Sequence, residues 1–273
     1  MIANKYNLIE KINEGSFGTV FKAINKRTDE YVAIKFEDKN SIIKSLKNEA
    51  KIYQYLGKLD GFPYLKMFGT INDKNFLVMN LLGHSLTEII QTNHLNINNV
   101  LYLGIQIIKR IQTLHEHHLL HRDIKPSNFI FGKDNETNKL YLVDFGFAKR
   151  YDFYGTHIEE KSINKIVGSP NFVSLNVHNL IEPSRRDDIE SCIYIIVTML
   201  LGKLEWFHKS NIIEIANLKK EIISNDEIPS FIKNMLYYIC DLVATYPLHS
   251  MVNNLFIHTS PSLIRREADF PFI

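Results

Sequence analysis

The chain has 273 residues, of which 45% are hydrophobic and 23% charged, and its formal net charge is +2. This length can form one large domain or two smaller lobes with substantial cores. The low net charge excludes an electrostatic case for nucleic acid as the main partner. We therefore expect a globular protein that requires no nucleic acid.

The cysteines and the apolar runs indicate the compartment. Cys192 and Cys240 each lie in an apolar run, so we predict reduced packing residues rather than a disulfide. The most apolar stretch, residues 192–201, is too short to span a bilayer, and residues 1–10 lack the apolar core of a secretory signal. We expect an intracellular protein, cytoplasmic or nuclear, with no membrane association.

The first third of the chain alternates short apolar runs with polar turns, a pattern typical of antiparallel strands. Five such runs occur, at residues 6–12, 19–25, 31–36, 64–71 and 76–82. Residues 41–56 instead carry apolar side chains at helical spacing and predict one helix. The pattern changes at residues 80–83, where we place a boundary between lobes.

The first turn, residues 13–18, is long for a hairpin and contains Gly15 and Gly18. Glycines lack a Cβ, so the backbone amides of such a turn can approach a phosphate group. Most glycines in turns only provide the turn, so this pair is a weak indication by itself.

Lys35 ends an otherwise apolar strand, although an exposed edge is the usual place for a strand lysine. Glu49 lies on the apolar stripe of the predicted helix beside Leu46 and Tyr53, where an unpaired carboxylate would be costly. A buried glutamate needs a cationic partner. We therefore predict an ion pair between Lys35 and Glu49.

The remainder of the chain is predominantly helical by its apolar spacing. We predict helices at residues 100–114 and 189–201 and a third that starts at residues 228–230. The third has an apolar face formed by Phe231, Met235, Tyr238, Ile239 and Leu242. A sheet-rich lobe followed by a helical lobe gives an α+β fold class.

Residues 121–128, His-Arg-Asp-Ile-Lys-Pro-Ser-Asn, combine a carboxylate, an ammonium and an amide in one short loop. Asp123 can accept a proton from an attacking hydroxyl, Lys125 can neutralise a moving phosphoryl group, and Asn128 can hold Mg²⁺. A predicted strand, residues 140–143, then ends at Asp144, whose carboxylate is a second candidate Mg²⁺ ligand. These residue types in this order are typical of phosphoryl transfer.

A histidine-rich segment precedes this loop and raises the alternative of a zinc site. It contains His115, His117, His118 and His121. The spacing His-Glu-x-x-His is absent, and no cysteine or carboxylate cluster completes four ligands. A metallohydrolase is therefore not favoured.

Three further strings are distinctive: Leu-Leu-Gly-His-Ser-Leu at 81–86, Asp-Phe-Gly-Phe-Ala-Lys-Arg-Tyr at 144–151 and Ser-Arg-Arg-Asp-Asp-Ile-Glu-Ser at 184–191. In these strings the chain resembles the casein kinase 1 group of protein kinases. Ser-Leu-Asn at 174–176 replaces the usual Ala-Pro-Glu of kinases and is similar to the Ser-Ile-Asn of this group. The similarity extends over residues 6–256.

The resemblance implies a bilobal kinase fold, with residues 1–82 and 83–273 as its lobes, that uses ATP and Mg²⁺. It implies transfer to Ser or Thr hydroxyls of protein substrates by a monomer. Lys35, Glu49, Asp123 and Lys125 would be catalytic, and Asn128 and Asp144 would bind the metal. The resemblance implies nucleotide contacts from Ile12, Gly15, Ser16, Phe17, Gly18, Val20, Ala33, Lys35, Met79 and Leu82.

Within this set Met79 would be the gatekeeper behind the adenine and Leu82 would contact it through its backbone. Asp188 would start the helix predicted at 189–201 and hold the catalytic loop by hydrogen bonds, and a helix N-cap carboxylate is compatible with that role. We expect Ser169 to form a hydrogen bond near Asp123 rather than to be a phosphorylation site.

Two positions depart from the group pattern. Asn13 replaces the first glycine of the loop, and Asn171 replaces an arginine that binds phosphate upstream of the acceptor in substrates. We expect weaker selection for such a phosphate, unless Lys165 or Lys203 replaces the missing cation. We also expect no regulatory tail after Ile273 and no need for an activation-segment phosphate.

A pseudokinase scaffold is the non-enzymatic alternative. Its usual sign is loss of Lys35, Asp123, Asn128 or Asp144, and all four are present. The sequence therefore favours the enzyme.

Overall fold

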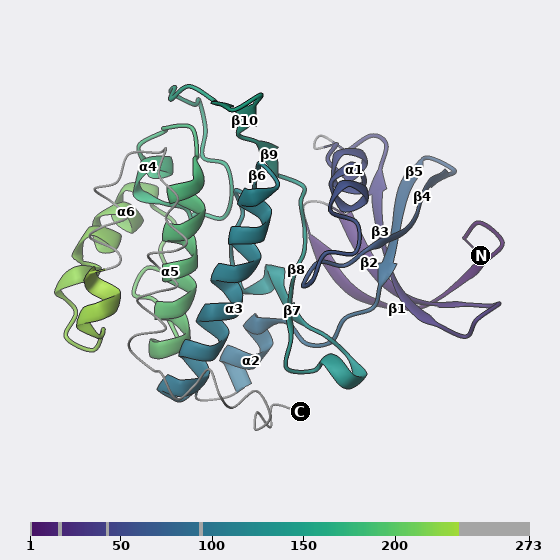
Figure 1. The fold of residues 1–273 in the computed structure, drawn as a ribbon, viewed down its shortest axis with the longest axis horizontal. Coiled ribbons are helices and arrows are strands. Elements are labelled where there is room, and N and C mark those ends of the chain that lie inside the picture. The colour runs from purple at the N-terminus through teal and green to yellow at the C-terminus, as the bar shows by residue number, and fades with distance from the viewer. Residues whose placement is uncertain (1, 16–17, 42–43, 93–94, 235–273) are drawn as a thin grey trace. The chain divides into compact units, whose positions relative to one another are not determined.

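The computed structural model describes residues 2–15, 18–41, 44–92 and 95–234. The chain divides into two compact units. Unit 1 contains Met1–His84 and Ile130–Gly146, and unit 2 contains Ser85–Phe129 and Phe147–Ile273. Figure 1 shows the sheet of unit 1 and the helices of unit 2.

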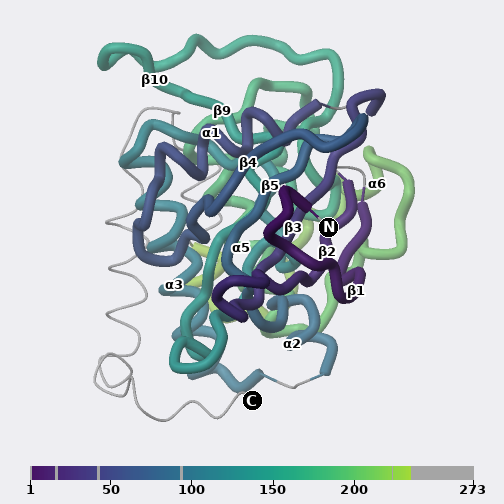
Figure 2. The backbone as a smooth tube through the Cα atoms, turned by 90° about the vertical axis from the view of Figure 1, so that its right-hand side faces the viewer, coloured from purple at the N-terminus to yellow at the C-terminus, as the bar shows by residue number. Residues whose placement is uncertain are grey.

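Unit 1 is built on a five-stranded antiparallel sheet with the order β1-β2-β3-β5-β4. The strands are β1 (Tyr6–Gly15), β2 (Gly18–Asn25), β3 (Tyr31–Asp38), β4 (Leu65–Ile71) and β5 (Lys74–Asn80). The tube of Figure 2 follows them from β1 onward. The five predicted strands are confirmed, with ends that differ by a few residues.

β3 is the central strand of this sheet, paired with β2 on one side and β5 on the other. Its residues from Val32 to Glu37 are all buried, which explains why its sequence is an apolar run rather than an alternating one. One face of the sheet forms a core from Ile2, Tyr6, Ala23, Val32, Ile34, Phe36, Phe76 and Val78.

The predicted helix at 41–56 is shorter in the structure, where α1 covers Leu46–Leu56. The carboxylate of Glu37 accepts hydrogen bonds from the backbone N–H groups of Ser45 (2.6 Å) and Leu46 (2.8 Å). Amides at a helix start have no partner within the helix, so this contact fixes the first turn at Leu46. Ile42, part of the predicted stripe, lies outside the described residues.

Residues 130–146 belong to unit 1, although the sequence-based division assigned them to the second lobe. The segment contains β7 (Phe129–Phe131) and β8 (Leu140–Leu142), which pair with each other, and a 3₁₀ turn, η2 (Asp134–Glu136). The backbone N–H of Phe131 donates to His84 O, and that of Leu142 donates to Gly61 O. These long-range bonds tie the segment to the first part of the chain.

Unit 2 is mostly helical, and α3 packs against α5 at its centre. Its helices are α2 (Leu86–Thr92), α3 (Ile97–Glu116), α4 (Leu175–His178), α5 (Arg185–Leu201) and α6 (Ile212–Glu221). Most of α5 is buried on all sides, as its continuous apolar sequence predicts. The helix predicted at 100–114 is confirmed within α3.

The predicted start of α5 is wrong by several residues, since the helix begins at Arg185. Ser184 is the N-cap, and the Asp187 carboxylate accepts hydrogen bonds from its backbone N–H and its hydroxyl in a capping box. Asp188 is therefore not the N-cap but lies inside the first turn. This leaves the Asp188 carboxylate available for contacts outside the helix.

Short elements complete unit 2: β6 (Leu119–Leu120) with β9 (Lys149–Arg150), β10 (Asp152–Phe153) with β11 (Thr156–His157), η1 (Pro126–Asn128) and η3 (Ile222–Ser224). Figures 1 and 2 both show the β10–β11 hairpin projecting from the helices of this unit. A helix begins at Ser230, and Met235, Tyr238, Ile239 and Leu242 of its predicted apolar face lie outside the described residues.

Cys192 is buried with a free thiol, and Cys240 lies outside the described residues. Within the described part of the chain, none of the helices has the length and apolar character to cross a membrane.

Candidate functional site

In unit 1, Lys35 joins two carboxylates that are distant in sequence. Its Nζ lies 2.8 Å from Glu49 Oε2 and 2.8 Å from Asp144 Oδ1. Lys35 is 6% exposed and Glu49 1% exposed, so water screens the cluster little. The predicted pair of Lys35 and Glu49 is confirmed, and the structure adds Asp144 to it.

The electrostatics of this cluster favour a charged lysine. Burial lowers the pKa of Lys35, but Glu49 and Asp144 reverse this effect, and the net shift is upward. Burial raises the pKa of Glu49 to about 7, with a further upward contribution from the charge of Asp144 and opposition from Lys35. One ammonium thus holds two carboxylates together in unit 1.

Asp144 is held in place by the helix α1. Its backbone N–H donates to the hydroxyl of Tyr53 at 3.2 Å, and the next residue, Phe145, packs edge-on against the Tyr53 ring at 4.9 Å. Phe145 is fully buried, so the turn that carries Asp144 is anchored by an aromatic side chain. The strand β8 ends two residues before this turn.

Several predicted nucleotide contacts lie on the Lys35 face of the sheet. Val20 in β2 is directly opposite Lys35, and Met79 in β5 is directly opposite Ala33. Directly paired residues present their side chains to the same face of a sheet. Ala33 and Lys35 are two positions apart on β3 and so also lie on the same face. Val20, Ala33, Lys35 and Met79 therefore share one face. Leu82 follows the end of β5 and is partly buried.

The glycine turn is only partly described. Gly15 pairs with Gly18 at the ends of β1 and β2, and Ser16 and Phe17 lie outside the described residues. Gly18 has φ +120°, and a Cβ there would lie 1.8 Å from Phe36 O, so only glycine fits. Ile12 lies at a β-bulge without a partner in β2, half exposed, and the register does not place it with the others.

In unit 2, the loop after α3 brings Asp123 together with three polar side chains. Lys125 Nζ lies 2.7 Å from Asp123 Oδ2, and Ser169 Oγ donates to Asp123 Oδ1 at 2.8 Å. Asn128 Nδ2 donates to Asp123 O at 2.8 Å. Lys125 also donates to Ser169 at 3.1 Å. The predicted hydrogen bond of Ser169 near Asp123 is confirmed.

The segment before Ser169 comes very close to this loop. Gly168 has φ +103°, and a Cβ at this position would lie 2.4 Å from Arg122 O. Any other residue would push the two backbones apart. Glycine at 168 therefore allows Ser169 to reach Asp123.

Asp188, in the first turn of α5, holds the loop that carries Asp123. Its carboxylate accepts the backbone N–H groups of His121 (Oδ2, 2.9 Å) and Arg122 (Oδ1, 2.9 Å), and His115 Nε2 lies 2.9 Å from Oδ2. Burial raises the pKa of Asp188, but the hydrogen bonds of His115 and His121 reverse this, and the net shift is downward. The predicted hold on the catalytic loop is confirmed.

Arg122 is paired with a carboxylate of the chain itself. Its Nη1 lies 3.3 Å from Glu182 Oε1, and Lys149 Nζ lies 2.6 Å from the same atom. The Nε of Arg122 donates to Phe147 O at 2.7 Å. Glu182 thus supplies the negative charge that these two cations need. Sequence reasoning did not identify Glu182.

Sequence reasoning also missed two buried side chains: His115, which contacts Asp188, and Lys219, which donates to the backbone carbonyls of Pro170 and Val173. The histidine segment was considered only for zinc, whereas His115 binds Asp188 and His117 Nδ1 lies 2.7 Å from Thr113 O. Among the described residues no group of three or more His, Cys, Asp or Glu side chains could hold a metal ion. The signal for His115 was its place on the buried side of α3.

The two arginines that begin α5, Arg185 and Arg186, make different contacts. Arg186 lies 3.2 Å from Glu160 and 3.8 Å from Asp187, while Arg185 lies over the ring of Tyr151. Arg186 is thus close to two carboxylates, and the Arg185 guanidinium packs on an aromatic face.

Comparison with known families adds one finding. A family model described as "Protein kinase domain" matches residues 6–253.

Proposed function

Because the chain belongs to the protein kinase family, we propose that it is a serine/threonine kinase similar to the casein kinase 1 group. Protein kinases transfer a phosphoryl group to protein substrates and generally use ATP with Mg²⁺. The finer assignment rests on the motifs at 81–86, 144–151 and 184–191. The observation that carries the chemistry is the buried Asp123 carboxylate with Lys125, Ser169 and Asn128 around it.

Asp123 is the proposed general base. Its side chain is 3% exposed, and each oxygen has a donor, Ser169 on Oδ1 and Lys125 on Oδ2. A substrate hydroxyl would attack the γ-phosphorus of ATP, its proton would pass to Asp123, and the bond to the ADP oxygen would break. Lys125 would stabilise the negative charge of the phosphoryl group during this transfer.

The residues present fit ATP and Mg²⁺. The Asp144 carboxylate is an oxygen donor, as Mg²⁺ prefers, and the Asn128 nitrogen donates to Asp123, which leaves the amide oxygen as the atom for a cation. The bound metal would neutralise charge on the phosphates of ATP. Lys35, already protonated and held by Glu49, would bind the α- and β-phosphates.

The direct test is transfer of labelled γ-phosphate from Mg-ATP to degenerate peptide libraries with serine, threonine or tyrosine as the acceptor. We expect transfer to serine and threonine only. Asp123→Asn and Asp144→Asn should each lower kcat by at least about a hundredfold, the usual range for acid–base groups. Lys35→Met should also lose transfer while the protein stays folded.

The exposed Asp226→Asn serves as the matched carboxylate control and should keep full turnover. Wild-type turnover by Asp144→Asn would contradict the assigned roles. Labelling of the tyrosine library alone would contradict the assigned acceptor class while leaving the family intact.

A further inference from the structure

Lys219, in the last turn of α6, is a buried cation that the proposed chemistry does not use. The residue is only 1% exposed, so its ammonium has lost its hydration. Nζ donates to Pro170 O at 2.9 Å and to Val173 O at 2.5 Å, and it lies 3.1 Å from His178 Nε2. Three acceptors therefore match the three hydrogens of the ammonium.

Two aromatic rings and one carboxylate compensate the charge of Lys219. Nζ lies 4.6 Å from the ring centroid of Tyr194 and 5.7 Å from that of Trp206, distances at which a ring stabilises a cation. The hydroxyl of Tyr194 donates to Glu190 Oε1 at 2.7 Å. Burial lowers the pKa of Lys219, and the charge of Glu190 opposes this shift only in part.

The two carbonyls that Lys219 binds belong to one compact turn, residues 169–173. The backbone N–H groups of Phe172 (2.8 Å) and Val173 (3.0 Å) both donate to Ser169 O, which closes the turn on itself. Lys219 contacts the turn at Pro170 and at Val173. A group that fixes these two carbonyls therefore also fixes Ser169.

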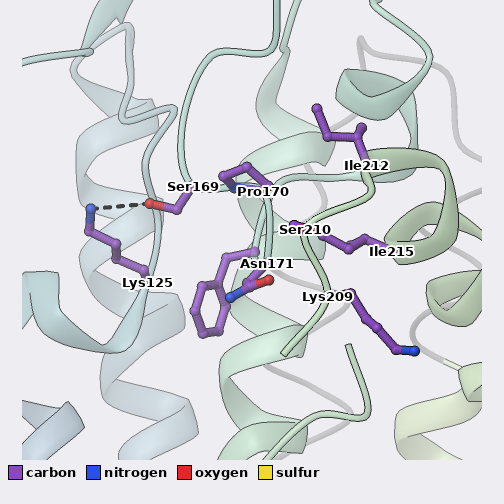
Figure 3. A pocket seen from close by; sticks show the side chains of 9 residues that line it. Lys125, Ser169, Pro170, Asn171, Lys209, Ser210, Ile212 and Ile215 are labelled. Carbon is purple, nitrogen blue, oxygen red and sulfur yellow. Dashed lines mark hydrogen bonds between the residues drawn. The ribbon is translucent and has the colours of Figure 1, made fainter. Parts of the chain in front are cut away.

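Ser169 connects this turn to the proposed base. Its hydroxyl donates to Asp123 Oδ1 at 2.8 Å and accepts a hydrogen bond from Lys125 at 3.1 Å. Figure 3 shows the contact of Lys125 with Ser169, and residues 169–172 line one side of the pocket drawn there. A continuous series of contacts thus leads from Lys219 through the turn to Asp123.

A second buried donor contacts the same turn. Trp206 Nε1 donates to Asn171 O at 2.9 Å, and Trp206 is 2% exposed. An apolar side chain could fill the place of Lys219 without the cost of burying a charge. A lysine that spends its hydrogens on two carbonyls of one turn indicates that the position of this turn matters.

We propose that Lys219 is a positioning residue for phosphoryl transfer, which holds the turn 169–173 by two of its carbonyls and so keeps the Ser169 hydroxyl on Asp123. The inference rests on the proposed function, because Asp123 is the base of that reaction. Lys219 acts on Asp123 only through the turn.

The first test is Lys219→Met, which removes the donors and keeps an unbranched side chain. We expect kcat to fall by about tenfold to a hundredfold, the effect of a misplaced reacting group. The KM for ATP should stay at its original value, since the cluster of Lys35, Glu49 and Asp144 is built within unit 1. Lys220→Met makes the same change at the exposed neighbour and should keep full kcat.

A double-mutant cycle with Ser169→Ala separates positioning from a general loss of stability. Ser169→Ala removes the hydroxyl through which the effect is carried. In that background Lys219→Met should lower kcat by no more than about twofold, which is the usual error of additivity. An equal loss of kcat in both backgrounds would show that Lys219 contributes stability alone, and this result would overturn the inference.

Trp206→Phe is a second, milder variant that answers the same question if Lys219→Met does not fold. It keeps an aromatic ring and removes only the donor to Asn171 O. Loss of one hydrogen bond of this kind should lower kcat by about twofold to tenfold. The loss should again disappear in the Ser169→Ala background, and a loss that persists there would contradict the inference.

Amide hydrogen exchange tests the hold on the turn without any phosphate transfer. The N–H groups of Phe172 and Val173 should exchange faster in Lys219→Met than in the unmodified protein, and at the original rate in Lys220→Met. Unchanged exchange in Lys219→Met would overturn the inference even if the protein is an active kinase. Faster exchange in a protein that transfers no phosphate would support the hold on the turn and contradict the proposed function.

Discussion

Replacement of Asp188 by asparagine tests how the catalytic loop is held. The carboxylate receives three hydrogen bonds, from the backbone of His121 and Arg122 and from the His115 ring. Asparagine keeps one acceptor oxygen, and its NH₂ group would face an N–H donor with no acceptor between them. One hydrogen bond to a charged group is therefore lost, and the other two become hydrogen bonds to a neutral group.

The expected cost follows from these contacts. Hydrogen bonds to a charged group contribute about 1.5–3 kcal/mol and neutral ones about 0.5–1.5 kcal/mol. Losing one and weakening two, less the smaller desolvation cost of a neutral amide, gives a loss of roughly 2–4 kcal/mol. For a protein of this size that loss lowers the apparent Tm by on the order of 5–15 °C.

The loop carries Asp123, so kcat should fall by at least about tenfold through misplacement of the proposed base. The KM for ATP should change little, because the cluster of Lys35, Glu49 and Asp144 is built separately in unit 1. Differential scanning calorimetry gives the Tm, and steady-state kinetics give kcat and KM, for Asp188→Asn and for a control variant. Asp226→Asn is the control, since Asp226 is fully exposed and has only a 3.9 Å contact with Lys233.

The stability of Asp188→Asn at acid pH gives a second test of this carboxylate. The pKa of Asp188 is lowered in the folded protein, so its stabilising effect is complete above the unfolded pKa and is lost as pH falls through the folded value. Asp188→Asn should therefore lose part of the acid sensitivity of unfolding. Unchanged Tm, turnover and acid midpoint would refute the role assigned to this carboxylate.

Other predictions concern three further positions and treatment with a phosphatase. Asn13→Gly should keep or lower the KM for ATP, because Asn adds bulk to the loop; a clear rise would reveal a favourable contact of Asn13. Burial and the nearby Lys219 lower the pKa of His178 to about 4, so stability should fall as pH drops from about 6.5 toward 4. His178→Gln should flatten that dependence in urea unfolding, and an equal slope would contradict it. Phosphatase treatment should leave turnover unchanged, because Glu182 already neutralises Arg122; loss of turnover would show that a phosphate is required. Asn171→Arg should raise kcat/KM on phosphoserine peptides relative to unphosphorylated ones, and no change would show that the added guanidinium does not face the substrate.

Much of the fold could be predicted because its signals are local. An apolar run between polar turns specifies a strand from neighbouring residues alone, and the five strands of unit 1 follow that rule. The pair of Lys35 and Glu49 was also predictable, since a carboxylate on the apolar stripe of α1 required a cation nearby. Helix starts were less accurate, because Glu37 and Ser184 decide them through contacts outside the apolar pattern.

The sequence by itself determined which chemical groups the chain offers for phosphoryl transfer, because Asp123, Lys125 and Asn128 lie within one loop of fixed spacing. The resemblance implied Asp188 as one of the residues that hold them, and only the tertiary structure identified His115 and Glu182. His115 and Asp188 are 73 positions apart, and Arg122 and Glu182 are 60 positions apart. Such partners carry no local signal, because a buried charge can be satisfied by any donor or acceptor that packing brings within about 3 Å.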